Sequence, residues 1–139
     1  MREKETKFMD EVIIYNEGEL HYEITRILNS LCFSPKYDGF NYLREAVRIV
    51  FASDRLMTGI SKTVYPLVAK RSGKTPAAVE RGMRFAISRA WEISETESKL
   101  KIFGNRALDK NWVPTNGELI YSLVDRLCCE AMLDSERYL

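Results

Sequence analysis

Apolar side chains recur at helical spacing along most of the chain. Two amphipathic segments, residues 19–32 and 40–53, repeat apolar positions every three or four residues, and Pro35 lies between them. The same periodicity returns in residues 76–93 and again in residues 116–133. The pattern predicts an all-α protein, a bundle of six or seven helices.

Proline and threonine mark the starts of the later helices. Pro66 would open a short helix at its first turn, where its missing N–H costs nothing. Thr75 is the expected N-cap of the long helix 76–93. Thr115 and Glu118 have the spacing of a capping box in front of the last helix.

The remaining segments divide the chain and carry weaker signals. Residues 19–139 are expected to form one helical domain, and residues 1–18 an N-terminal extension. Within that extension, the apolar residues 12–15 suggest either a short strand or a docking segment. A short helix is expected at about 55–64, and residues 95–114 are expected to be a connection with about one helical turn.

Three residues within residues 66–93 have the mutual spacing of a helix-turn-helix. Ala69 would allow two helices to approach closely, because its side chain is small. Gly73 would supply the positive φ of the turn, and Val79 would fix the second helix against the first. The segment therefore predicts a helix-turn-helix, with residues 76–93 as its second helix.

On a helical wheel, the long helix has one apolar and one polar side. Val79 lies on the apolar side, together with Met83, Ala86, Ile87 and Ala90. Opposite it lie Ala77, Arg81, Arg84 and Ser88, with Glu80 and Phe85 on the flanks. Arginine is well suited to guanine edges and phosphates, so this side is typical of a helix that reads the major groove. Glu80 would either accept from the amino group of cytosine or orient an arginine.

The basic residues cluster in this part of the sequence. The net charge of the whole chain is +1, but the segment from Ser61 to Trp91 has seven basic residues against the single acid Glu80. The seven are Lys62, Lys70, Arg71, Lys74, Arg81, Arg84 and Arg89. This asymmetry is typical of a surface that faces DNA. The alternative is a solvated basic helix face without a partner.

Composition excludes several other classes of protein. The sequence has no apolar run of about 18 residues and no secretory signal pattern, so we expect a cytoplasmic protein without a membrane partner. Cys128 and Cys129 are two of three cysteines, and we expect one buried beside one exposed rather than a redox or metal site. His21 is the single histidine. No catalytic motif is present, so neither an enzyme nor a cofactor is expected.

The same residues resemble a known family. Over roughly residues 22–131 the chain is similar, in order and spacing, to the C-terminal DNA-binding effector domain of the sporulation master response regulator, the stage 0 sporulation protein A family. The similarity rests on Tyr42-Leu43-Arg44-Glu45-Ala46, Ile60-Ser61-Lys62, Tyr65-Pro66, Ala69-Lys70-Arg71, Val79-Glu80-Arg81, Arg84, Ala86-Ile87, Ala90-Trp91 and Pro114-Thr115-Asn116. The resemblance implies a helical bundle that binds a short DNA element as tandem copies.

The resemblance also implies roles for individual residues. Glu80, Arg81 and Arg84 would read bases in the groove. Contacts to the DNA backbone would come from Ser61, Lys62, Lys70, Arg71, Lys74, Thr75 and Ala77.

The chain departs from the family pattern at three points. The family proteins carry a phosphoacceptor receiver domain, which the residues before the helical domain are too few to form, so control by phosphorylation is not expected. Ala78 stands where the family usually has an arginine that contributes to DNA contact, and Phe85 stands where a histidine is typical. These two changes allow an altered DNA site, weaker DNA binding, or a surface used for a protein partner.

Two functions follow from this sequence. The first is a sequence-specific transcription regulator whose partner is double-stranded DNA, bound as a homodimer or tandem dimer. Pairing would use the last helix, where Tyr121 is expected to be exposed and Met132 lies outside the apolar stripe. The alternative is a helical interaction module that modulates a protein partner without reading DNA. The first function needs Arg81 and Arg84, whereas the second needs Phe85 or the last helix.

Overall fold

The computed structural model describes residues 6–8, 11–13, 15–53 and 59–137. This part of the chain contains six α-helices: α1 (Glu17–Ser30), α2 (Asp38–Ala52), α3 (Tyr65–Ser72), α4 (Pro76–Ile93), α5 (Thr96–Phe103) and α6 (Asn116–Arg137). It also contains a π-helical turn η1 (Ile60–Val64), a 3₁₀ turn η2 (Gly104–Leu108) and two short strands, β1 (Thr6–Phe8) and β2 (Glu11–Ile13). The predicted all-α bundle is confirmed.

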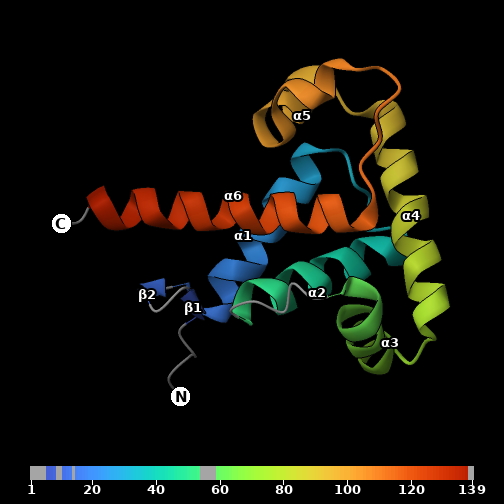
Figure 1. Cartoon of the computed structure of the whole chain (residues 1–139), viewed down its shortest axis with the longest axis horizontal. Helices are drawn as coiled ribbons and strands as arrows, with labels where there is room; N and C mark the ends of the chain where they lie inside the picture. The colour runs from blue at the N-terminus through green and yellow to red at the C-terminus, as the bar shows by residue number, and fades with distance from the viewer. Residues whose placement is uncertain (1–5, 9–10, 14, 54–58, 138–139) are drawn as a thin grey trace.

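Helix α6 runs through the middle of the molecule and begins beside α4 (Figure 1). The N-terminal end of α2 also packs against α4. Helix α4 therefore lies across the N-terminal ends of both α2 and α6 (Figure 1). Helix α3 lies beside the N-terminal end of α4, and α5 lies near its C-terminal end. The antiparallel hairpin of β1 and β2 contacts α2 and α6. Both helices of the predicted helix-turn-helix thus lie at one side of the bundle.

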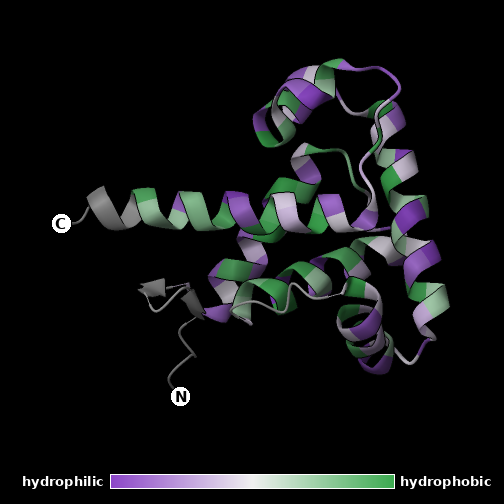
Figure 2. Cartoon of the chain, in the orientation of Figure 1, coloured by the Kyte–Doolittle hydropathy of each residue, from purple (hydrophilic) through white to green (hydrophobic). Residues whose placement is uncertain are grey.

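The core is built from the apolar stripes that the sequence predicts. In α4, the residues Val79, Met83 and Ile87 are buried, and in α6 so are Leu119 and Leu123. Hydrophobic and hydrophilic residues are interspersed along the coloured parts of the helices in Figure 2. Burial of these faces against one another, rather than helix propensity alone, accounts for the stability of helices this short.

The predicted helix starts are confirmed by their hydrogen bonds. The Oγ1 of Thr75 accepts from the backbone N–H of Ala78 at 3.1 Å, at the start of α4. At the start of α6, the Glu118 N–H donates to the Thr115 hydroxyl at 3.1 Å, and the Thr115 N–H donates to the Glu118 carboxylate at 3.0 Å. Pro66 lies in the first turn of α3. Helix α6 continues to Arg137, beyond the predicted end.

The prediction for residues 95–114 was wrong in extent. Instead of one helical turn, this segment forms the whole of α5 followed by η2. Trp91, Phe103 and Trp112 pack as three ring pairs with centroids 5.2–5.6 Å apart. The indole N–H of Trp91 also donates to the carbonyl of Trp112 at 2.9 Å. These contacts join residues far apart in sequence, so helical periodicity within the segment does not show them.

Two further expectations concern aromatic residues. Tyr15 is buried and packs against Phe51 with ring centroids 5.9 Å apart, so the end of the predicted extension docks on the bundle. Tyr121 was expected to be exposed, and this was wrong, because its ring is partly buried against the core. It follows the fully buried Ile120 and therefore lies only about 100° around the helix from it.

The predicted helix at about 55–64 falls partly outside the described residues, since residues 54–58 are not described and η1 covers the rest. The expectation of one buried cysteine beside one exposed cysteine is confirmed, because Cys128 is buried and Cys129 is exposed. Burial, helped by the charge of Asp125, raises the pKa of the Cys128 thiol to about 12. Among the described helices, none has the length and apolar character that crossing a bilayer requires.

Candidate nucleic-acid interface

Helices α3 and α4 form the predicted helix-turn-helix. Gly73 ends α3 with φ +66° and ψ 35°, a left-handed conformation that favours glycine. The N–H of Lys74 donates to the carbonyl of Ala69 at 2.9 Å, which closes the turn. Ala69 and Val79 are both buried where the two helices meet. All three signature residues therefore have the roles that their spacing predicts.

Close backbone contact fixes α4 against α2. A Cβ atom at Gly39 would lie 2.1 Å from the carbonyl oxygen of Gly82, so only glycine fits at this crossing. A Cβ atom at Gly82 would lie 2.8 Å from the ring of Tyr42. This contact was not predicted from the sequence, although a glycine inside a long helix is a signal of close packing. The crossing sets the distance and direction of α4 relative to the bundle.

A buried asparagine at the start of α6 holds the middle of the same helix. The side-chain N–H₂ of Asn116 donates to the carbonyl of Glu80 at 3.1 Å and to the Tyr65 hydroxyl at 3.0 Å. Burial, with the charge of Glu80, raises the pKa of Tyr65 despite the bond from Asn116, so the hydroxyl stays protonated. Asn116 thus joins α3, α4 and α6. The only indication of this role in the sequence was that Asn116 is among the residues that carry the family resemblance.

The outer face of α4 carries the predicted base-reading residues. Ala77, Arg81, Arg84 and Ser88 are all exposed, as the helical wheel predicts. Arg84 forms an ion pair with Glu80 one turn earlier, and the two side chains are 62% and 41% exposed. In the described part of the chain, Arg81 has no carboxylate partner. One of the two arginines is thus held by Glu80, and the other has its full hydrogen-bonding capacity available.

The predicted backbone-contacting residues surround this face but differ in their partners. Ser61, Lys62, Lys70, Lys74, Thr75 and Ala77 are all exposed. Among the described residues, none forms an ion pair with Lys62, Lys70 or Lys74. Ser61 and Lys62 lie in η1, which reaches the start of α6 because Ile60 packs close to Gly117. The lysines therefore extend the exposed positive charge from α4 across α3 and η1.

Arg71 differs from these lysines because it pairs with Glu45 of α2. Glu45 also pairs with Arg48. Burial favours the protonated form of the Glu45 carboxyl, but hydrogen bonds and charge from the two arginines outweigh it, so the pKa of Glu45 lies below its usual 4.5. Ala78, where the family pattern has an arginine, is only partly exposed.

Two more features border the outer face of α4. A cleft of about 500 Å³ lies between α4 and the loop before α6, and its lining includes Glu80, Arg84 and Ser88. Phe85 is 52% exposed and meets Tyr37 edge to face, with ring centroids 5.2 Å apart. Both features adjoin the arginines, so they belong to the same surface.

The fold and this surface define a helix-turn-helix protein whose second helix has its polar side toward solvent. The model of the family "Sporulation initiation factor Spo0A C terminal" matches residues 24–127. The chain belongs to this family, which confirms the resemblance seen in the sequence. The family is a DNA-binding effector domain that acts in transcription regulation during sporulation and is not a catalytic family.

Proposed function

We propose that this chain is a sequence-specific transcription regulator that places α4 in the major groove of double-stranded DNA. The observation that carries the proposal is the pair of exposed arginines, Arg81 and Arg84, in the middle of a helix that is anchored on its opposite side. Gly82 fixes that helix to α2, and Asn116 fixes it to α6. Fixed positions are what base recognition requires, because a bidentate contact tolerates little displacement.

The two arginines have different tasks in this proposal. Arg81 donates two of its N–H groups to the O6 and N7 atoms of a guanine. Arg84 is oriented by Glu80, which holds one side of the guanidinium and directs the remaining N–H groups outward. Glu80 could instead accept from the amino group of a cytosine, and the substitution Glu80→Gln distinguishes this role from the orientation of Arg84. The variant would lose cytosine preference alone if Glu80 reads a base, and guanine preference if Glu80 orients Arg84.

The surrounding residues bind the phosphate backbone. Lys62, Lys70 and Lys74 supply exposed charge, and Ser61 and Thr75 supply hydroxyl groups. The N–H of Ala77, at the start of α4, is suited to an anion because the first N–H groups of a helix lack partners within it. Arg71 would join them by leaving Glu45 for a phosphate.

We also propose that two copies pair through α6 on adjacent DNA sites. Because Tyr121 is partly buried, we assign this contact to Met132, the other residue that the sequence suggested, and to its neighbour Leu133. Met132 and Leu133 are 49% and 58% exposed, at the end of α6 that points away from α4 (Figure 1). Replacing Met132 by Ala should lower cooperativity on a two-site duplex and leave single-site affinity unchanged, whereas Tyr121→Ala should mainly lower stability.

The alternative function, a module that binds a protein and not DNA, is favoured by one observation, the exposed ring of Phe85. It predicts that Phe85→Ala abolishes function while Arg81→Ala does not. The polar and charged side chains around Phe85 favour DNA instead, because protein interfaces have apolar centres depleted of charge.

The proposal is tested by selecting duplexes from a randomised DNA library with the whole chain. Affinity for the selected duplex and for a scrambled one is then measured at about 50 and about 200 mM salt. We expect one preferred sequence, tighter binding to it than to the scrambled duplex, and a log–log salt slope of roughly −0.9 for each phosphate contacted. No enrichment of any sequence, or affinity that does not change with salt, would overturn the proposal.

A further inference from the structure

One apolar ring stands on the polar outer face of α4. Phe85 is 52% exposed and follows Arg81 by one helical turn, so both side chains project from the same side of the helix. The other exposed side chains nearby, Arg84 and Ser88, are polar. A benzyl group has no donor or acceptor, so it contributes nothing to phosphate binding or to recognition of polar base edges.

A contact with Tyr37 orients the ring of Phe85. The Tyr37 ring meets Phe85 edge to face, with an interplanar angle of 83°. Tyr37 is the N-cap residue of α2, and two residues later Gly39 touches the backbone of α4 at Gly82. The loop that carries Tyr37 is therefore fixed relative to α4. The Lys36 ammonium lies 5.9 Å from the centroid of the Tyr37 ring.

We infer that Phe85 is a specificity-determining residue that recognises the C5-methyl group of a thymine in the major groove. The inference rests on the proposed function, since it requires α4 to lie in that groove. The thymine methyl is the apolar group that base pairs present on the major-groove edge, and apolar side chains contact it directly. Arg81 and Phe85 would then read positions next to each other, one polar and one apolar.

The size of the patch favours a methyl group over a protein. A specific protein interface buries about 800 Å² on each partner. One half-exposed ring among charged and polar neighbours supplies far less apolar area than that. A single methyl group, in contrast, is covered by one ring.

The test removes that methyl group and nothing else. In the selected duplex, each thymine is replaced in turn by deoxyuridine, and the affinity of the chain is measured for every replacement. The wild-type chain should lose about fourfold at one position, which is the value expected for burying one methyl group. Phe85→Ala should bind the thymine and uracil duplexes equally at that position, and its other base preferences should remain.

Two variants serve as controls. Ile93→Ala truncates another exposed apolar residue of the same helix, 67% exposed at its C-terminal end, and should keep the thymine preference of the wild type. Phe85→Leu keeps an apolar side chain and should keep part of that preference, which separates methyl recognition from a general loss of fold.

The outcomes separate this inference from the function on which it rests. If the library yields no preferred duplex, the proposed function fails and the inference fails with it. If a preferred duplex is found but has no thymine whose methyl matters, the inference alone is overturned. The same holds if Phe85→Ala keeps the preference for thymine over uracil, and Phe85 would then be left to contact a protein.

Discussion

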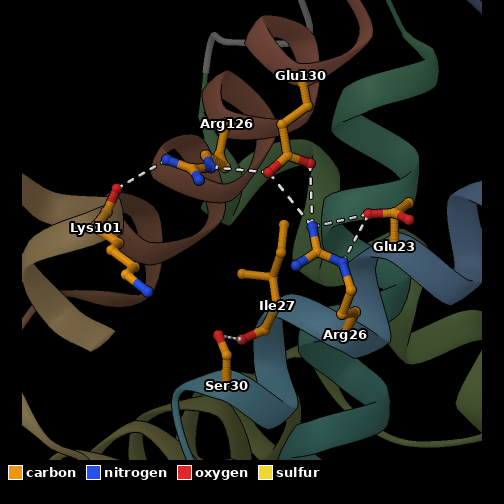
Figure 3. Close-up of polar contacts among 7 residues, drawn as sticks. All are labelled: Glu23, Arg26, Ile27, Ser30, Lys101, Arg126 and Glu130. Atoms are coloured by element: carbon orange, nitrogen blue, oxygen red, sulfur yellow. Dashed lines mark hydrogen bonds and ion pairs between the residues drawn. The ribbon is translucent and has the colours of Figure 1, made fainter. Parts of the chain in front are cut away.

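Arginine has opposite uses in two regions of this molecule. Where α1, α5 and α6 meet, Arg26 bonds to Glu23 at 2.9 Å and to Glu130 at 3.2 Å (Figure 3). Arg126 bonds to the same Glu130 at 2.9 Å and donates to the carbonyl of Lys101 at 2.9 Å. Both arginines thus have structural partners, and their contacts join the three helices.

The outer face of α4 carries the same residue types with fewer partners. Arg84 has Glu80 alone, and within the described part of the chain Arg81 forms no ion pair. Arg71 and Arg89, counted with the basic cluster in the sequence, pair with Glu45 and Glu92. The basic segment is therefore less positive in the folded chain than its composition suggests. The ion-pair partners of an arginine therefore indicate its availability for DNA better than the number of basic residues in the segment does.

The largest effect is expected from removing Arg81, the unpaired arginine on the outer face of α4. Arg81→Ala should lose about 1–3 kcal/mol of binding to the selected duplex, roughly 5- to 150-fold, because a bidentate base contact is removed. Binding to a scrambled duplex should fall much less, and thermal stability should not change. Fluorescence anisotropy on the two duplexes measures the difference. Equal losses on both would make Arg81 a backbone contact.

The next effect is expected at Glu130, the carboxylate that Arg26 and Arg126 share. Glu130→Gln removes the charge that Arg26 and Arg126 share, and should lower the free energy of unfolding by about 1 kcal/mol, the upper end for partly exposed pairs. The melting temperature should fall by roughly 2–5 °C. Urea denaturation and a DNA titration of the same sample check both parts. A loss of DNA affinity without a loss of stability would contradict the assignment of this network to the fold.

A smaller effect is expected at an exposed lysine beside the turn. Lys74→Ala should weaken binding to all sequences alike and make the salt slope shallower by roughly 0.9, because one phosphate contact is lost. Lys110→Ala removes an exposed lysine outside the predicted contact residues and provides the control. A sequence-dependent effect of Lys74→Ala would mean that it reads a base.

The smallest effect concerns acid stability at the pair that ties α3 to α2. Because the pKa of Glu45 is depressed in the folded chain, its contribution to stability is complete above about pH 4.5 and is lost as the pH falls below that value. Glu45→Gln should therefore lower stability at neutral pH and flatten its decline in acid. Urea titrations between pH 3 and 7, with Glu92→Gln as the control, measure this. An unchanged acid profile would show that the ion pair with Arg71 does not stabilise the fold.

The sequence predicted the helix-turn-helix well because its signals are local. Thr75 and Pro76 mark the start of α4, and Gly73 ends the helix before it, so both boundaries depend on neighbouring residues. The polar side of α4 also follows from a fixed period of 3.6 residues per turn. Local chemistry of this kind needs no knowledge of the rest of the fold.

The features that hold the site in place were not predictable in the same way. Asn116 donates to the carbonyl of Glu80, a contact that exists only after α6 has docked on α4. The crossing at Gly39 and Gly82 likewise joins positions in two separate helices. Arg71 pairs with Glu45 of α2, which is distant in sequence. The sequence therefore showed the charge of Arg71 but not that this charge is already paired.

Arg81 of α4, which has no ion-pair partner among the described residues, is proposed to bind DNA, whereas Arg126, which is paired with Glu130 of α6, is not. The most direct test compares Arg81→Ala with Arg126→Ala, which remove the same side chain from the two regions, on the selected duplex at about 50 and about 200 mM salt. We expect Arg81→Ala to lose at least fivefold in affinity at both salt concentrations, and Arg126→Ala to bind like the wild type. Equal affinities for the two variants, or a larger loss with Arg126→Ala, would show that Arg81 has no special role in binding DNA.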